Sequence, residues 1–328
     1  MTEGALRSIP HELFTPELAR GLLGRLCSNV ETALKGKRRT VELAVCALAA
    51  RGHLLLEDVP GVGKTTLAQA LARSFDLSFN RVQFTSDLLP ADILGAQIFD
   101  PRTATFTFRP GPVFAQVVLA DELNRAPPRT QSALLEAMAD VQVSLDGTTH
   151  PLPQPFIVLA TQNPREQSGT YPLPDSQLDR FLLRLSIGHP QADVERDLLL
   201  SRTAEDPVRS IRPVATAAEL IRLQLTAAAV KVDPSLAGYI VAIAEATRRS
   251  ALLAGGISTR GALALLAASK AHALLEGRGH LLPDDVKAVA VACLAHRVAP
   301  AGHDSSEGNR DGAERVLREL LERVEIPE

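Results

Sequence analysis

The chain has 328 residues, a formal net charge of −3 at pH 7 and 45% hydrophobic residues. This size predicts two domains, and the small negative charge excludes a strongly basic nucleic-acid-binding surface over the whole chain. The three cysteines are far apart in the sequence, which argues against a disulfide framework or a thiolate zinc site. No apolar run reaches the roughly 18 residues of a membrane-spanning helix. We therefore expect a cytoplasmic protein without a membrane span.

Short apolar segments alternate with helical segments over the first part of the chain. The predicted strands are His53–Glu57, Phe79–Phe84, Gln116–Ala120, Phe156–Thr161 and Leu182–Ile187. Helical patterns lie between them at Lys64–Ser74, Pro128–Asp140 and Ser176–Arg180. Because strands that alternate with helices form parallel sheets with helices on both faces, we expect an α/β core.

Two segments interrupt this alternation and are predicted to be β-hairpins. Gln97–Arg109 alternates apolar and polar side chains, with Asp100-Pro101 at a turn. Val141–Leu145 alternates strictly and ends at Asp146-Gly147, a dipeptide that is typical of two-residue hairpin turns. Both hairpins are therefore expected as insertions into the α/β scaffold.

The chain becomes helical after about residue 190. Helical periodicity covers Glu195–Arg202, Ala215–Leu225, Pro234–Arg249, Arg260–Leu275, Pro283–His296 and Ala313–Val324. Asp233-Pro234 and Ser258-Thr259 are typical helix starts. We therefore predict an α/β nucleotide-binding core over residues 1–190, which includes N-terminal helices and both hairpins, and an all-α domain over residues 191–328.

The most informative stretch runs from an apolar strand through a glycine-containing loop into a helix, at residues 54–68. The loop and the helix start read Pro60-Gly61-Val62-Gly63-Lys64-Thr65-Thr66. Small residues let backbone N–H groups surround phosphate oxygens, and the helix N-terminus adds partial positive charge. Lys64 is expected to reach the β- and γ-phosphates, and the Thr65 hydroxyl to bind Mg²⁺. The strict phosphate-loop pattern has glycine where this chain has Asp58.

Two acids follow the predicted strand Gln116–Ala120. These are Asp121 and Glu122, one βα unit downstream of the phosphate loop. In phosphate-loop ATPases the first acid supports Mg²⁺ and the second polarises the water that attacks the γ-phosphate. The pair therefore predicts a site that hydrolyses ATP, with Asp121 near the metal and Glu122 as the base.

With these motifs the chain resembles AAA+ ATPases, and within them the MoxR family. The matching runs are Glu57–Thr65, Ala120–Met138, Ala160–Pro164, Gly169–Phe181 and Gly256–Leu265. The resemblance implies an AAA+ P-loop fold in which a parallel sheet with inserted hairpins is followed by a small all-α lid domain. It also implies ATP and Mg²⁺ as cofactors, a hexameric homo-oligomeric ring, and a von Willebrand factor A domain protein as partner.

Four further residues take roles from the resemblance. Asn163 would be sensor 1 at the γ-phosphate, although Asn-Pro is also a common turn. Arg180 would be an arginine finger for the neighbouring subunit's ATP, although arginine is also favoured at a helix C-terminus. Arg260 would be sensor 2, carried by the lid onto the phosphates of its own subunit, and Gly36 would lie against the adenine.

The resemblance implies a chaperone-like ATPase that remodels or matures partner proteins, and two alternatives stay open. One is a nucleic-acid motor, although tight binding needs several phosphate contacts and the second hairpin has no Lys or Arg, so we expect no nucleic-acid partner. The other is a slow ATP-gated adaptor, against which the presence of Glu122, Asn163 and Arg180 argues. Gln83 could hydrogen-bond Glu122 as a switch, and Arg125 faces either phosphate or a subunit interface.

Overall fold

A five-stranded parallel sheet in the order β2-β5-β8-β1-β9 forms the centre of the protein. The computed structural model describes residues 12–163, 169–200, 206–301 and 309–327. The strands of this sheet are β1 (His53–Glu57), β2 (Phe79–Gln83), β5 (Val117–Asp121), β8 (Ile157–Gln162) and β9 (Phe181–Leu185). Strand β5 is buried along its whole length, as a strand covered on both faces should be. The predicted α/β core is confirmed.

The parallel register decides which residues share an edge of the sheet. Leu56 of β1 pairs with Thr161 of β8, and β5 runs parallel on the other side of β8. The segments that follow β1, β5 and β8 therefore meet at one edge. His53 pairs with Phe181, so the residues just before β9 lie at the opposite edge.

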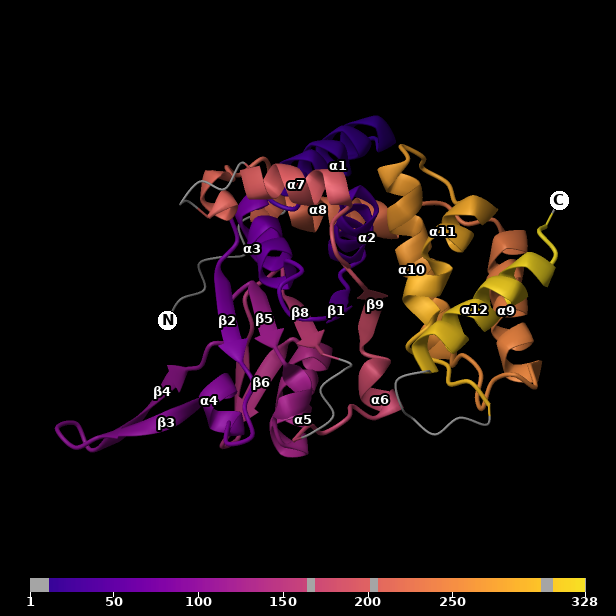
Figure 1. Ribbon diagram of the computed structural model, residues 1–328. Coiled ribbons are helices and arrows are strands. Elements are labelled where there is room, and N and C mark those ends of the chain that lie inside the picture. The colour runs from indigo at the N-terminus through magenta and orange to yellow at the C-terminus, as the bar shows by residue number, and fades with distance from the viewer. Residues whose placement is uncertain (1–11, 164–168, 201–205, 302–308, 328) are drawn as a thin grey trace.

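Helices cover both faces of the sheet, as Figure 1 shows. Leu54 and Leu56 belong to the apolar layer under α1 (Pro16–Glu31), α2 (Arg38–Ala49) and α3 (Lys64–Ser74). Leu55, between them, belongs to the opposite layer, with residues of α4 (Pro90–Leu94) and α5 (Pro128–Asp140). This division follows from the strand itself, because successive side chains point to opposite faces.

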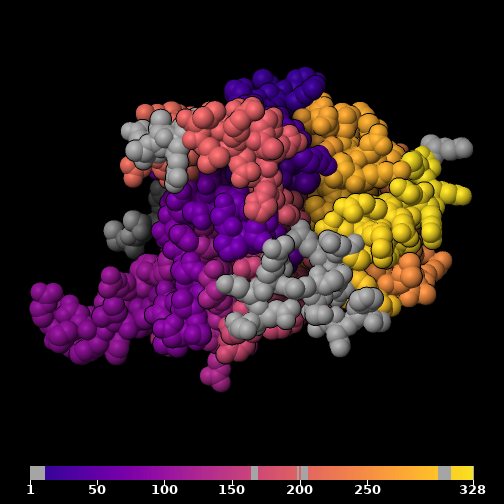
Figure 2. Space-filling view, in the orientation of Figure 1, coloured from indigo at the N-terminus to yellow at the C-terminus, as the bar shows by residue number. Residues whose placement is uncertain are grey.

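Both predicted hairpins are present as separate two-stranded antiparallel sheets. The first consists of β3 (Gly95–Asp100) and β4 (Thr105–Pro110), and the second of β6 (Gln142–Leu145) and β7 (Thr148–Pro151). Asp146 and Gly147 both have positive φ, at 48° and 75°, which is the backbone that a tight hairpin turn requires. The first hairpin extends away from the body of the molecule (Figures 1 and 2).

Four helices form the C-terminal bundle beside β9 (Figure 1). They are α9 (Pro234–Arg249), α10 (Thr259–Leu275), α11 (Pro283–Leu294) and α12 (Asn309–Arg323). The predicted helix starts are confirmed, because Asp233 accepts a hydrogen bond from the N–H of Ser235 and Ser258 one from the N–H of Gly261. Among the helices of the described residues, none is long and apolar enough to cross a membrane.

Two helices, α7 (Ala192–Leu200) and α8 (Ala217–Ala228), connect β9 to this bundle, with a 3-10 turn at Pro207–Ser210 between them. The short helix α6 (Asp175–Leu178) lies between β8 and β9, and a second 3-10 turn, Leu123–Arg125, follows β5. The helix predicted over Glu195–Arg202 corresponds to α7, and its last two positions lie outside the described residues. Helix α8 packs on both α2 and α10, so it touches the core and the bundle, and the boundary at residue 190 stays a prediction.

Candidate nucleotide site

The loop between β1 and α3 has the backbone of a phosphate cradle. Gly61 and Gly63 have φ values of 86° and 103°, a region that residues with a Cβ rarely adopt. A Cβ at Gly63 would also come within 2.8 Å of Leu34 Cδ1. Helix α3 begins directly after Gly63, so its free N–H groups and its partial positive charge face the loop, which includes Pro60 and Val62.

Lys64 lies folded over this loop. Its Nζ donates hydrogen bonds to the carbonyls of Asp58 at 2.5 Å and Val59 at 3.2 Å. Burial lowers the pKa of the Lys64 ammonium below its ordinary value, and the negative charges of Asp58, Asp121 and Glu122 oppose that shift. The ammonium is therefore a partly desolvated cation, held by carbonyls that a phosphate oxygen can replace.

Asp121 is a buried carboxylate at the end of β5. Its Oδ1 accepts a hydrogen bond from Thr161 Oγ1 at 2.6 Å, and its Oδ2 accepts one from Arg81 Nη2 at 2.5 Å. Thr65 lies in the first turn of α3, beside the same edge of the sheet. Carboxylate and hydroxyl oxygens suit Mg²⁺, which keeps several of its waters. The donor set of Asp121 and Thr65 therefore fits the metal that the sequence predicts.

Glu122 is held by a second set of contacts. It has a left-handed backbone with φ of 57°, and its N–H donates to Thr161 Oγ1 at 2.9 Å. Its Oε2 accepts from Gln83 Nε2 at 2.7 Å and pairs with Arg125 Nε at 3.0 Å. The expected hydrogen bond from Gln83 is therefore present, and Arg125 is placed beside the predicted base.

Two of these contact residues were not found from the sequence. Thr161 orients both acids, and Arg81 places a cation on Asp121 and also donates to Gln83 Oε1 at 3.2 Å. The available signal was a charged residue inside the predicted strand Phe79–Phe84, where Arg81 stands two positions before Gln83.

Asn163 and Gly36 are the other two residues that the resemblance assigns to the nucleotide site. Asn163 is buried and follows β8, whose last residue, Gln162, accepts a hydrogen bond from the N–H of Asp58. Gly36 has a φ of 71° and lies against Val194 of α7, to which a Cβ at Gly36 would approach within 3.2 Å. The roles of Asn163 at the γ-phosphate and of Gly36 against the adenine stay predictions.

Arg180 and Arg260 lie elsewhere. Arg180 follows α6 at the start of β9, where its Nη1 donates to the carbonyl of Leu135. Arg260 Nε lies 3.9 Å from Asp179 Oδ2, which places it beside Arg180. Strand β9 separates both from the phosphate-loop edge by 5 residues, or about 16 Å at a rise of about 3.3 Å per residue. Arg260 therefore lies away from the phosphate loop of its own subunit in this structure, because α10 starts at the opposite edge of the sheet, and its role as sensor 2 stays a prediction.

Comparisons with known proteins agree with this architecture. The ATPase family associated with various cellular activities (AAA) matches residues 53–183, and the AAA lid domain matches residues 245–319. The uncharacterized protein YeaC of Bacillus subtilis is 44% identical over 93% of this chain and 95% of its own. Chaperone MoxR1 of Mycobacterium tuberculosis is 37% identical over 100% of this chain and 90% of its own. The chain belongs to the MoxR family of AAA ATPases.

A solved structure supports the same assignment. The crystal structure of a candidate ATPase from Cytophaga hutchinsonii superimposes with a TM-score of 0.85 and 34% sequence identity, over 95% of this chain and 97% of that one. This MoxR-family protein is therefore an ATPase, and ATP is its nucleotide. Which of its residues carry the reaction stays a prediction.

Asp58, the departure from the strict loop pattern in this MoxR-family chain, is bonded to the segment that follows β9. Its Oδ2 accepts hydrogen bonds from Ser186 Oγ at 2.8 Å and from the N–H groups of Ile187 at 2.8 Å and Gly188 at 2.7 Å. Burial raises the pKa of the Asp58 carboxyl, but the hydrogen bonds from Gly188, Ser186, Val59 and Ile187 together hold it below its ordinary value. The carboxylate thus ties the phosphate loop to the segment after β9.

Replacing Asp58 by alanine should lower the free energy of unfolding by about 1–3 kcal/mol, because the N–H groups of Ile187 and Gly188 lose their acceptor. Chemical denaturation at neutral pH measures this. The carboxyl pKa is depressed in the folded state, so the difference from wild type should shrink as the pH falls through that lowered pKa. Asp140→Ala, at an exposed aspartate, is the control and should change stability by no more than about 0.5 kcal/mol. Equal effects of the two variants would contradict the anchoring role.

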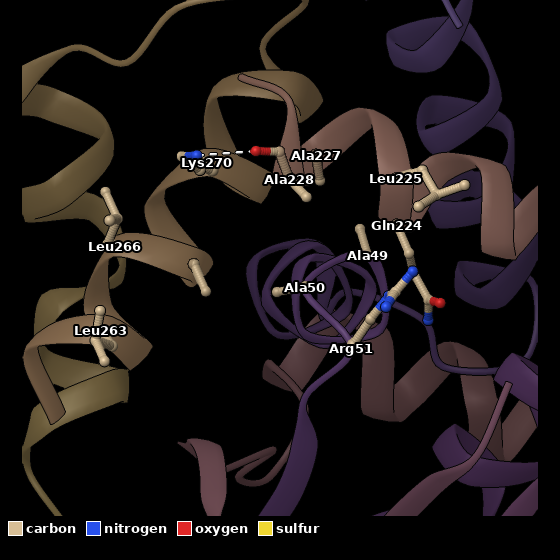
Figure 3. A pocket seen from close by; sticks show the side chains of 11 residues that line it. Ala49, Ala50, Arg51, Gln224, Leu225, Ala227, Ala228, Leu263, Leu266 and Lys270 are labelled. Atoms are coloured by element: carbon tan, nitrogen blue, oxygen red, sulfur yellow. Dashed lines mark hydrogen bonds between the residues drawn. The ribbon is translucent and has the colours of Figure 1, made fainter. Parts of the chain in front are cut away.

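A separate cavity of about 310 Å³ lies between α2, α8 and α10 (Figure 3). Most of its lining is apolar, with Arg51, Gln224 and Lys270 as the polar members. Lys270 Nζ donates to the carbonyl of Ala228 at 2.9 Å. The residues that line this cavity differ from those of the predicted nucleotide site, which lies at the carboxyl edge of the sheet.

Proposed function

We propose that this protein hydrolyses Mg²⁺-ATP at the interfaces of a homo-oligomeric ring, a hexamer, and uses the cycle to remodel or mature partner proteins. One observation carries the proposal. The phosphate loop and acids lie at one edge of the sheet, whereas Arg180 and Arg260 lie together at the other. A subunit therefore holds both halves of an ATPase site but cannot close them on each other.

Within one subunit the phosphate-loop edge does the binding and the proton transfer. The N–H groups after Gly61 and Gly63, the Lys64 ammonium and Thr66 would hold the phosphates, while Thr65 and Asp121 would hold Mg²⁺. Mg²⁺ would neutralise charge on the β- and γ-phosphates. Glu122 accepts the proton of the attacking water, and Gln83 and Arg125, which both contact its Oε2, orient the carboxylate.

A second subunit supplies the remaining charge. Arg180 and Arg260 can stabilise a transferring phosphoryl group only on a neighbouring molecule, since about 16 Å of β9 separates them from their own loop. The exposed side chain of Arg260, at 57%, is accessible for such a contact. This arrangement supports hydrolysis that depends on assembly.

The first hairpin is the surface that we assign to the client protein. Ile98, Phe99 and Phe106 are exposed on it, and the two phenylalanine rings lie 5.2 Å apart. Apolar groups of this size on a projecting hairpin suit a protein surface, and the name of MoxR1 describes that relative as a chaperone. A von Willebrand factor A domain protein is the partner implied by the resemblance. A cytoplasmic location fits both the proposed client and this partner.

The nucleic-acid alternative has less support. Arg102 on the first hairpin pairs with Asp100 at 3.6 Å, so part of its positive charge is neutralised. Salt-sensitive stimulation of ATP hydrolysis by DNA or RNA would reverse this preference, because phosphate contacts make affinity fall steeply with salt. The slow-adaptor alternative predicts nucleotide binding without sustained phosphate release.

Replacing Arg180 by alanine should leave ATP binding unchanged and lower hydrolysis by about 10³-fold or more, as expected for a finger that stabilises transition-state charge. Mixing Arg180→Ala with Lys64→Ala protein should restore phosphate release, because each variant supplies the half that the other lacks. Arg249→Ala, at a lid arginine that is 79% exposed, is the control and should behave as wild type. Normal turnover by Arg180→Ala alone would falsify the trans arrangement.

A further inference from the structure

Arg297 makes an unusually complete set of contacts between the lid and the start of β9. It lies in the turn after α11, and its side chain is only 3% exposed. Its Nε donates to Asp179 Oδ1 at 2.7 Å. Its Nη2 donates to the carbonyls of Phe181 at 2.7 Å and Asp179 at 3.2 Å, and its Nη1 to that of Leu182 at 3.3 Å. The guanidinium therefore binds the backbone on both sides of Arg180.

The same arginine also contacts the start of α10. A Cβ at Gly261 would come within 3.1 Å of Arg297 Cδ, so the side-chain stem of Arg297 lies directly against this turn of the helix. Arg260, the residue before, faces Asp179 Oδ2, while Arg297 holds Oδ1. One carboxylate thus lies between two arginines of the lid.

We propose that Arg297 is a positioning residue that, through Asp179, holds Arg180 and Arg260 as one rigid cationic unit for the nucleotide of the neighbouring subunit. The inference rests on the proposed function, because it needs Arg180 to act in trans. Arg297 itself touches no nucleotide.

Two physical arguments support this role. Burying a guanidinium is costly unless its charge is paired and its N–H groups are bonded, and here an acid and several carbonyls of one short segment do both. In addition, a charge that stabilises a transition state must be placed to within about 1 Å, since such a displacement can cost about 100-fold in rate. The fork of Arg297 fixes the backbone of residues 179–182, and therefore the position from which Arg180 extends.

The coupling has a consequence for the lid. Arg297 and Arg260 belong to the lid, whereas Asp179 and Arg180 precede β9 of the core sheet. Arg184 of β9 adds a further link, with Nη2 3.8 Å from Glu314 of α12. These contacts tie the lid to β9 and to the segment before it, so Arg180 and Arg260 keep one arrangement for as long as the contacts hold.

The test uses Arg297→Lys in the full-length protein, because lysine keeps the buried charge but cannot form the planar fork. We expect an unchanged Kd for ATP, hydrolysis lowered about 100-fold, and recovery of phosphate release when the variant is mixed with Lys64→Ala. Asp179→Asn, which keeps the size of the side chain and removes its charge, should give the same pattern. Arg278→Lys is the matched control, since Arg278 pairs with Asp285 within the lid at 2.6 Å, and it should hydrolyse ATP as wild type does.

The outcomes separate this inference from the proposed function. If mixing with Lys64→Ala rescues Arg180→Ala but not Arg297→Lys, the positioning role is wrong and the finger stands. If Arg180→Ala is not rescued either, the trans arrangement itself fails. If Arg297→Lys loses ATP binding, the positioning role is wrong and Arg297 only stabilises the lid. In the double variant with Arg180→Ala, Arg297→Lys should add less than its full loss, because the contribution that it makes through Arg180 is already gone.

Discussion

Replacing Lys64 by alanine should weaken ATP binding by about 10- to 100-fold or more, because hydrogen bonds to charged groups contribute about 1.5–3 kcal/mol each. The partly desolvated ammonium lies over the loop and near both acids, so its removal leaves negative charge unopposed where the phosphates bind. Titration with a fluorescent ATP analogue measures the change in Kd.

Lys270→Ala is the matched control for this variant. Lys270 also donates to a main-chain carbonyl, that of Ala228, but it lines the separate cavity between α2, α8 and α10. Its removal should leave the Kd for ATP unchanged. If Lys64→Ala binds ATP with the wild-type Kd, and thermal unfolding shows that the variant is folded, the phosphate loop is not the nucleotide site.

Replacing Glu122 by glutamine should preserve ATP binding and lower hydrolysis by about 10²- to 10⁴-fold, the usual contribution of a general base. Glutamine has nearly the same shape, and its amide oxygen can still accept the hydrogen bond that Gln83 donates to Glu122. What is lost is the ability to take a proton from water. Single-turnover phosphate release, measured beside the Kd for ATP, separates the two steps.

Glu136→Gln, at an exposed glutamate of α5, is the control and should hydrolyse ATP at the wild-type rate. The Glu122→Gln protein with ATP should also accumulate in the assembled form, which makes it the best state in which to capture a client. Unchanged hydrolysis by Glu122→Gln would mean that another group accepts the proton.

Local sequence patterns were sufficient to predict the elements that form the phosphate-loop side of the site. Helix α3 has the predicted bounds Lys64–Ser74, and both hairpins form where alternation and the Asp146-Gly147 turn predicted them. These features depend on residues close together in the chain, such as glycines that allow positive φ. The acids at the end of β5 follow in the same way, because parallel strands bring their carboxyl ends to one edge.

The contacts that orient the side chains of the site could not be predicted from such local patterns. Thr161 of β8 reaches Asp121 on the neighbouring strand β5, 40 positions earlier in the chain, and Asp58 is held by residues 186–188, more than a hundred positions later. Strand register decides both, and it depends on how the whole sheet packs. Nothing local marks Arg81 as the partner of Asp121 either.

The sequence by itself therefore determined that this chain binds and hydrolyses ATP, because a phosphate loop, an acidic strand end and their order along the chain are local properties. Only the tertiary structure decided where the cations lie. The lid packs on β9, which carries Arg260 to Asp179 and Arg180 and away from its own phosphate loop. That placement arises from contacts such as Arg297 with residues 179–182, between segments more than a hundred residues apart, and it separates the two halves of the site onto opposite edges of the sheet.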